Sequence, residues 1–507
     1  MKYFKDFYYS EPSSPQESQS PCIEDQITTH SLLDYLKEEL RSVEIADTQH
    51  YKSERVSNFL QVPLGIEKVI NFGSLVCLDS FLYTFTILPL RATFALLNIG
   101  KTLNASQKAD ILKMLLFLLT SAFLLIYTEP SRMYHGVRGQ DNVKLYVIFN
   151  ALEIADKLCC SIGQDILDSL FSRTRLTQKP STTPIYLALA VIYAVAHSLV
   201  FLYQLVALNV AVNSYDNALL TLLLSNQFVE IKGSVFKRFD KSSLFQITCA
   251  DIVERFQLML MLTIIACRNL IELSGSNFAF LPRAFIRSNT QLETIFSPVV
   301  IVILSEMAVD WLKHAFITKF MHIRPSIYGR FVDILAGDLV STTKKIGAPV
   351  DLAPKASRRL GFAAIPLGAF VVRVAVQALG MLSDSSSIDE CATLPPSALQ
   401  RGAVVMQWFV WLLVCVVGWL VLLAIKLLLG IRLSAFAHHR QAEAVARRTE
   451  DVLTNLQTPI GEGNEDKDDR IRSKQHLSTR IDDVPNAPTG KIPLEELSRY
   501  DMVKRIW

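Results

Sequence analysis

The chain has 507 residues, of which 50% are hydrophobic and 20% are charged, and its formal net charge is +3. Soluble globular proteins carry about 25% charged residues, disordered chains combine low hydrophobicity with high net charge, and nucleic-acid-binding proteins need a basic surface. This composition excludes a disordered or nucleic-acid-binding chain and favours a membrane protein, provided that the apolar residues are gathered into spans.

The first 68 residues precede every long apolar run. Residues 1–30 hold the polar, proline-bearing segment Ser10–Pro21 and lack the apolar stretch and cleavage site of a signal peptide, so we expect a disordered cytosolic leader. Residues 31–68 place apolar side chains at helical spacing. This pattern predicts amphipathic helices that lie in the cytosol or on the membrane surface.

Seven apolar runs follow, and each is a candidate transmembrane helix because about 20 residues cross a bilayer. They are Val69–Leu90, Ile111–Tyr127, Ile185–Val212, Phe256–Leu273, Leu292–Leu312, Gly361–Leu382 and Val404–Ile431. Two stretches of mixed polarity, Lys144–Phe171 and Tyr215–Ile231, suit interfacial, re-entrant or protein-enclosed helices. The sequence thus predicts an all-α, polytopic helical membrane protein whose membrane domain covers residues 69–433.

The basic residues indicate how the runs are oriented. Residues 313–359 are rich in Lys and Arg whereas residues 383–403 hold one Arg, so the positive-inside rule places the first segment in the cytosol and the second in the lumen. A cytosolic N-terminus then needs one more crossing, for which Leu145–Ile162 is the candidate. We expect about seven or eight transmembrane helices and cytosolic termini, with a cytosolic helix at 434–457 and a mostly disordered cytosolic tail at 458–507.

Charged residues inside or beside the apolar runs are the candidate functional positions, because a charge in a membrane is costly and suggests function or a specific helix contact. They are Asp79, Glu153, Asp156, Asp165, Glu306, Asp310 and Arg373. Glu306 and Asp310 lie one helical turn apart, and we expect one of them to pair with Arg373 across helices. A lipid-facing or water-facing position and an ion or substrate path are the alternatives.

Four residues beside the fifth run form a candidate site for lipid headgroups. Lys313, His314, Lys319 and Arg324 follow or end that run, where they would meet lipid phosphates; ordinary positive-inside charge is the alternative. The sequence holds no G-x-S-x-G, H-E-x-x-H or P-loop motif, and none of its eight Cys forms a C-x-x-C pair or has a His at metal-ligand spacing. We therefore expect no enzymatic activity, no cofactor and no metal.

Five blocks of the sequence resemble the family of transmembrane anterior posterior transformation proteins. They begin FLQVPLGIEKVINF at 59, KLYVIFNALEIADK at 144, HSLVFLYQLVALNV at 197, DIVERFQLMLMLTI at 251 and EMAVDWLKHAFITKF at 306. The segments FVEIKGSVFKRF and KHAFITKF are specific in residue type and spacing. The resemblance covers residues 31–433.

This resemblance implies a multi-pass, non-enzymatic protein of the endoplasmic reticulum membrane. Fungal members are linked to a complex with a membrane protein that bears a SUN-like lumenal domain and protects newly made proteins, and animal members are linked to the ciliary base. We therefore expect a scaffold subunit in folding quality control, with membrane lipid and such a protein as partners and no nucleic acid. The alternatives are a transporter or channel built on Asp79, Glu306, Asp310 and Arg373, and a membrane-embedded enzyme acting on lipid.

Overall fold

The structure is a computed structural model that describes residues 46–98, 104–140, 142–172, 182–213, 241–275, 289–321, 323–344, 355–386 and 398–444, with single positions at 229, 231, 233, 446, 447 and 449. The leader, residues 31–45, the stretch 214–228 and the tail after 449 lie outside these residues, so what the sequence predicts there stays a prediction. The chain divides into two compact units, Met1–His50 and Tyr51–Trp507, and the second holds the buried apolar core.

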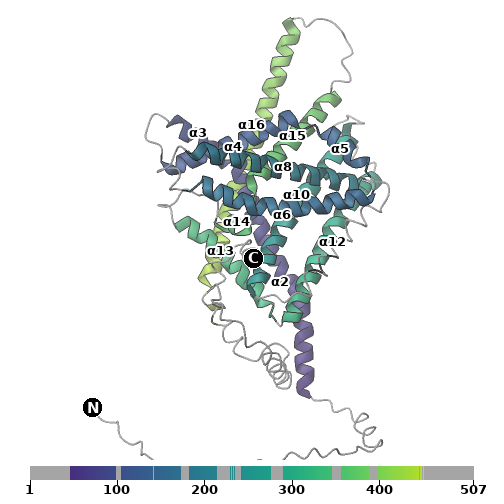
Figure 1. Cartoon of the computed structure of the whole chain (residues 1–507), viewed down its shortest axis with the longest axis vertical. Helices are drawn as coiled ribbons and strands as arrows, with labels where there is room; N and C mark the ends of the chain where they lie inside the picture. The colour runs from purple at the N-terminus through teal and green to yellow at the C-terminus, as the bar shows by residue number, and fades with distance from the viewer. Residues whose placement is uncertain are drawn as a thin grey trace, which may run out of the picture. The chain divides into compact units, whose positions relative to one another are not determined.

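Every regular element in the described ranges is a helix, which confirms the all-α prediction for them (Figure 1). The helices are α2 (Ala46–Phe85), α3 (Ile87–Leu97), α4 (Ala105–Tyr127), α5 (Pro130–Arg138), α6 (Asn142–Leu170), α8 (Thr183–Val212), α10 (Lys241–Gly275), α12 (Asn289–Met321), α13 (Ser326–Lys344), α14 (Lys355–Leu360), α15 (Ala364–Ser386) and α16 (Ala398–Ala442).

Five stretches of these helices are long and apolar enough to cross a membrane, as a polytopic membrane protein requires. They are Val56–Leu97, Ala105–Tyr127, Thr183–Val212, Ala364–Met381 and Leu412–Ala442. They coincide with or overlap the first, second, third, sixth and seventh predicted runs. The fourth and fifth runs lie in α10 and α12, which also carry the buried charges described below.

Helix α2 joins two segments that the sequence pattern separates. It passes without a break from the amphipathic stretch before residue 69 into the first apolar run, with Pro63 inside it. The helix ends at Phe85, and the Thr86 hydroxyl donates a hydrogen bond of 2.7 Å to the carbonyl oxygen of Leu82. The first run is therefore divided between α2 and α3 rather than forming one straight helix.

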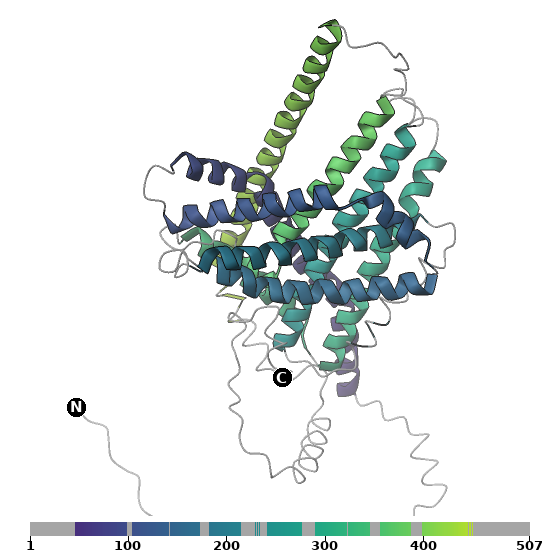
Figure 2. The same ribbon diagram turned by 45° about the horizontal axis from the view of Figure 1, so that its top comes forward.

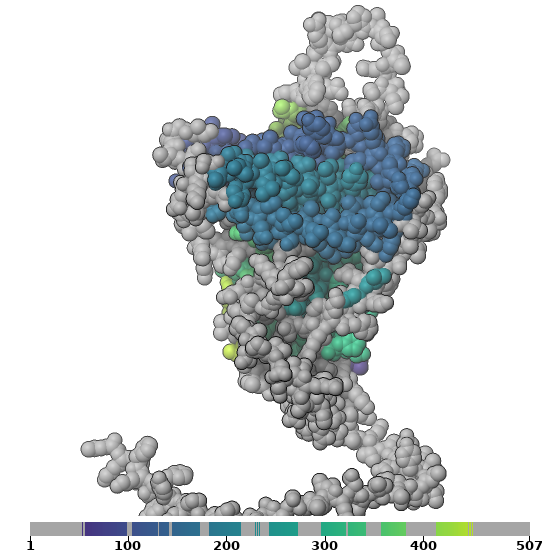
Figure 3. Space-filling view, in the orientation of Figure 1, coloured from purple at the N-terminus to yellow at the C-terminus, as the bar shows by residue number. Residues whose placement is uncertain are grey.

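Helices α4, α8 and α6 lie side by side, with α8 in the middle and α15 crossing α4 and α8 (Figures 1 and 2). In the space-filling view α4, α6 and α8, coloured blue to teal, cover much of one face (Figure 3). Gly163 on α6 permits the close approach of α8, because a Cβ at this position would lie 1.9 Å from the ring of Tyr193. Such spacing is expected where a helix uses a small residue to admit its neighbour.

Two clusters of buried apolar side chains hold the remaining helices together. The first joins α2, α10, α12, α13 and the end of α16, and it includes Ile66 and Phe331. The second joins α2, α8, α10, α12 and α15 around Phe201 and Phe370, whose ring centroids are 6.1 Å apart. Since α2, α10 and α12 contribute to both clusters, they connect the two parts of the helix assembly.

The apolar part of α16 differs from the other candidate spans because the described residues leave it almost entirely uncovered. None of its most apolar window is buried, whereas the corresponding windows of the other four spans are 33–50% buried. The N-terminal end of α16 projects away from the other described helices (Figure 2), whereas Trp419 and Lys426 farther along contact α2. A helix that is apolar on all sides and uncovered needs lipid or another membrane helix around it.

Candidate functional site

The densest group of buried charges lies where α2, α10, α12 and α13 meet, and we call it the polar junction. Its members are Glu67, Asp251, Arg255, Asp310, Trp311, Lys313, His314 and Tyr328. The sequence places these groups one helical turn apart on α10 and on α12, so each set shares a helix face. Three carboxylates thus face an arginine, a lysine and a histidine within the protein.

Arg255 organises the first half of the polar junction. Its guanidinium donates to Asp310 Oδ2 from Nε at 3.2 Å and from Nη2 at 2.7 Å, and to Glu67 Oε1 from Nη1 at 2.6 Å. The indole N–H of Trp311 donates to the same Glu67 oxygen at 2.8 Å. A guanidinium that forms a fork on one carboxylate and reaches a second one fixes three helices in one geometry.

Asp251 organises the second half. Its Oδ1 accepts from Lys313 Nζ at 2.7 Å, and its Oδ2 lies 2.7 Å from His314 Nε2. The other ring nitrogen of His314 lies 2.9 Å from the Tyr328 hydroxyl. Lys313 Nζ also lies 3.2 Å from Asp310 Oδ1, so the lysine connects the two halves.

The electrostatics of the polar junction fix the protonation states of Asp251 and Tyr328. Burial alone would raise the pKa of the Asp251 carboxyl, but the charge of Lys313 and the hydrogen bond from His314 outweigh burial and hold this pKa well below its usual range. Burial and the Asp251 charge raise the pKa of the Tyr328 hydroxyl well above its ordinary value. The carboxyl is therefore ionised and the phenol neutral at physiological pH, as suits a structural contact.

Two of the predicted headgroup residues belong to this junction. Lys313 is 1% exposed and His314 is fully buried, so the prediction that they meet lipid phosphates is wrong. The reason is that α12 turns this face toward α10 and α13 instead of toward the membrane surface. Lys319 is exposed and Arg324 is half-buried, and their proposed contact with headgroups stays a prediction.

Arg373 has a different partner from the one the sequence suggests. Its Nε donates to Thr128 Oγ1 at 2.9 Å and its Nη2 to the Thr128 carbonyl oxygen at 2.8 Å. Thr128 is the C-cap of α4, and the carbonyls at a helix C-terminus lack partners within the helix and attract cations. The predicted pair of Arg373 with Glu306 or Asp310 is therefore wrong: Arg373 binds Thr128, Asp310 is bonded within the polar junction, and Glu306 lines a cavity.

The remaining acidic candidates lie in separate places. Asp79 on α2 pairs with Lys426 on α16, and Asp165 is exposed on α6. Glu153, Asp156 and Glu306 line a cavity of about 420 Å³ between α6, α10 and α12. Three of these residues thus share one cavity, whereas Asp79 and Asp165 lie apart from it.

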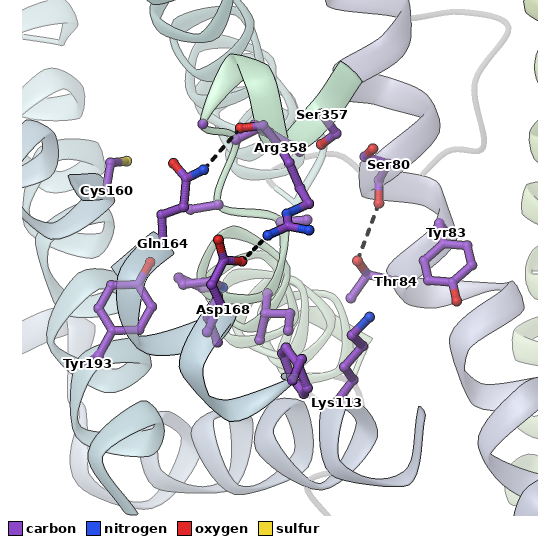
Figure 4. A pocket seen from close by; sticks show the side chains of 18 of the residues that line it. Ser80, Tyr83, Thr84, Lys113, Cys160, Gln164, Asp168, Tyr193, Ser357 and Arg358 are labelled. Carbon is purple, nitrogen blue, oxygen red and sulfur yellow. Dashed lines mark hydrogen bonds and ion pairs between the residues drawn. The ribbon is translucent and has the colours of Figure 1, made fainter. Parts of the chain in front are cut away.

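A second, more apolar cavity of about 150 Å³ lies among α2, α4, α6, α8 and the α14–α15 connection (Figure 4). On one wall Arg358 pairs with Asp168 and accepts a hydrogen bond of 3.4 Å at its carbonyl oxygen from Gln164. Lys113 is 8% exposed and lies over the Phe171 ring, 4.9 Å from its centroid. Apolar walls with a few polar groups suit a small amphipathic ligand.

Sequence inspection missed several of these residues. Lys426 could have been identified from the sequence, since it is the only charged residue inside the last apolar run. Asp251 and Arg255 had a weaker signal, their spacing of one turn just before the fourth run. Glu67 and Tyr328 had none, because their roles depend on which helices become neighbours.

Comparison with known proteins gives a consistent family relationship. A family described as a eukaryotic membrane protein family matches residues 103–442. The chain is 36% identical to endoplasmic reticulum membrane protein 65 of Schizosaccharomyces pombe, over 93% of this chain and 80% of the relative. It is 38% identical to the transmembrane anterior posterior transformation protein 1 homolog of Xenopus laevis, over 75% and 70%, and 39% identical to the Homo sapiens homolog, over 70% and 64%. No solved structure matches the chain.

Proposed function

This chain belongs to a eukaryotic membrane protein family that includes the transmembrane anterior posterior transformation proteins, and from this we propose that it is a scaffold. It is a multi-pass helical membrane protein. In the proposed function it is a non-enzymatic subunit of the endoplasmic reticulum membrane that holds a membrane protein with a SUN-like lumenal domain. The name of the Schizosaccharomyces pombe relative supports this location. The proposed process is protection and folding of newly made proteins, with a link to the ciliary base in animal relatives.

The observation that carries this proposal is that the chain's intramembrane charges bind groups of the same chain. Asp79 pairs with Lys426 between α2 and α16, and Arg373 holds the end of α4 to α15. The polar junction does the same for α2, α10, α12 and α13. Charges used in this way stabilise a helix arrangement, which is what a rigid scaffold requires.

The transporter alternative predicts that Asp79, Glu306, Asp310 and Arg373 line one path. A transporter gathers its substrate-binding groups at one site near the bilayer midplane, often on discontinuous helices. Here Asp79, Asp310 and Arg373 each bind a different partner of this chain, and Glu306 lines the cavity of about 420 Å³. This arrangement favours the scaffold.

Helix α16 is the surface through which we propose that the partner is held. It is the candidate span whose apolar window is entirely uncovered in the described part of the chain. Several of its apolar side chains, Val417 and Val421 among them, are more than half exposed. Apolar side chains on a rigid helix can pack closely against a helix of a second membrane protein.

The test is purification of the full-length protein from its native membrane in a mild detergent, with identification of the proteins that accompany it. We expect a membrane protein with a SUN-like domain in a near-equal amount. Val417→Phe with Val421→Phe should reduce its recovery, whereas Leu118→Phe with Leu125→Phe, a matched change on exposed positions of α4, should not. Absence of any equimolar partner would contradict the scaffold, and recovery unchanged by the α16 variant would contradict only the role of α16.

A further inference from the structure

We infer that Asp156, Cys160 and His197 form a binding site for one transition-metal ion, with Zn²⁺ as the best match. All three side chains are buried, and their ligand atoms lie within 4.8 Å of one another. Asp156 and Cys160 stand one turn apart on α6, and His197 lies on the adjacent helix α8. The site is separate from the polar junction and independent of the proposed scaffold function.

The distances between the three groups suit a tetrahedral ion. Cys160 Sγ lies 3.7 Å from Asp156 Oδ1 and 3.8 Å from His197 Nε2. Ligands bound to Zn²⁺ at roughly 2.0–2.3 Å in tetrahedral geometry are roughly 3.3–3.7 Å apart. The Asp156 and His197 atoms lie 2.7 Å apart in a hydrogen bond, so ion binding would widen this one contact by about half an ångström.

The donor set and its charge also match Zn²⁺. A thiolate, an imidazole and a carboxylate form a mixed set that zinc prefers over harder cations such as Mg²⁺ and Ca²⁺. Binding releases the thiol proton of Cys160 to solvent, and the resulting thiolate and the Asp156 carboxylate together balance the charge of the ion. A neutral assembly is the favourable one beside a membrane-spanning helix such as α8.

The surroundings of His197 orient it as a metal ligand. Its Nδ1 lies 3.1 Å from the Tyr193 hydroxyl, and its ring stacks on Phe201 with centroids 4.4 Å apart. Metal-binding histidines use their second nitrogen in such a hydrogen bond, which fixes the ring and the tautomer. The close packing at Gly163 brings the Tyr193 ring to this position.

The cluster lies between the two cavities, which gives an ion access and leaves room for a fourth ligand. Cys160 and Tyr193 line the cavity of about 150 Å³ (Figure 4), and Asp156 lines the cavity of about 420 Å³. Three protein ligands would then hold the zinc ion, and a water molecule would occupy its fourth coordination position.

Cobalt substitution tests the site on the full-length protein in detergent, after a chelator has removed bound metal. Titration with Co²⁺ should produce a thiolate-to-cobalt charge-transfer band and tetrahedral visible bands that saturate at about one ion per chain. Zn²⁺ should abolish both. Cys160→Ser should remove the charge-transfer band, and Tyr193→Phe should weaken binding about 10-fold.

The neighbouring cysteine provides the matched control. Cys159→Ser changes the adjacent, half-buried thiol on the same helix, and it should retain the band and its titration curve. No band in folded wild-type protein, or an unchanged band in Cys160→Ser, would overturn the site. If Cys160→Ser does not fold, X-ray absorption of the zinc-loaded wild type decides: about one sulfur with nitrogen and oxygen ligands supports the site, and a shell without sulfur or with several sulfurs overturns it.

Discussion

The polar junction and the apolar part of α16 use their residues in opposite ways. At the junction the charged side chains are buried or, for Glu67, half-buried, and each one meets groups from neighbouring helices. In the apolar part of α16 the side chains are uncovered by the described residues, and the charge within this run, Lys426, is paired with Asp79. The difference indicates that polar chemistry fixes the helix arrangement, while the uncovered apolar helix remains for contacts outside the chain.

The largest expected effect comes from removing a carboxylate at the junction. Asp251→Ala deprives Lys313 and His314 of their shared partner, and breaking a buried pair in this way costs about 3 kcal/mol. Denaturant unfolding of the protein in detergent should show a loss of that size. Asp165→Ala removes an exposed carboxylate on α6 and should change stability by less than about 0.5 kcal/mol. Equal losses in the two variants would contradict the structural role of the junction.

The same carboxylate gives the junction a pH dependence. Burial opposes ionisation of Asp251, but Lys313 and His314 outweigh burial, so its pKa is lower in the folded than in the unfolded protein. Its contribution to stability is therefore complete above about pH 4, the unfolded value, and is lost as pH falls toward the folded value. The midpoint temperature of thermal unfolding should fall more steeply below about pH 4 for the wild type than for Asp251→Ala. Parallel pH profiles would show that the carboxylate is not stabilised as described.

A conservative change at the junction should have an intermediate effect. Arg255→Lys keeps the charge but removes the fork that reaches Asp310 and Glu67 together, so we expect a loss of about 1–2 kcal/mol. Arg132→Lys on α5, where the side chain is 85% exposed, is the control and should be neutral. A neutral Arg255→Lys variant would mean that charge alone, without geometry, holds the three helices.

Arg373 provides a smaller test within the spans. Arg373→Leu leaves the Thr128 carbonyl at the end of α4 without its donor, at a cost of about 1 kcal/mol. Arg373→Lys should recover part of this loss in the midpoint of thermal unfolding. If both variants unfold like the wild type, the contact with α4 does not stabilise the fold.

The smallest stability effect is expected on α16. Val417 is 52% exposed, so Val417→Phe should change the free energy of unfolding by less than about 0.5 kcal/mol. Circular dichroism and thermal unfolding of the isolated protein measure this directly. A large loss would show that the apolar part of α16 packs against its own chain, and the contrast with the junction would disappear.

The helical membrane architecture could be predicted because apolar runs are a local property of the sequence. The partners of the buried charges could not be predicted in this way, because they lie far apart along the chain. Lys313 and Asp251 are 62 residues apart, and the basic position of Lys313 at the end of a run suggested a headgroup contact although its helix face is turned inward. Helix boundaries were equally hard to predict, since no local signal showed that α2 continues through residue 68.

The metal-binding candidate shows the same limit. Asp156 was recognised as a polar position in the sequence, but Cys160 and His197 lie on different helices, and no spacing rule along the chain connects them. Only the packing of α6 against α8, made close by Gly163, brings them together. The sequence predicts which residues are neighbours within one turn of a helix, whereas residues that cluster between two helices are found only once the fold is known.

Site-specific photo-crosslinking from α16 in native membranes, before any detergent is added, tests the scaffold account most directly. A photoactivatable residue in place of Val417 should give one crosslinked membrane protein with a SUN-like domain, and the same residue in place of Leu118 on α4 should give none. Crosslinking of Val417 to lipid alone, or to no protein in particular, would contradict the claim that this uncovered helix holds the partner.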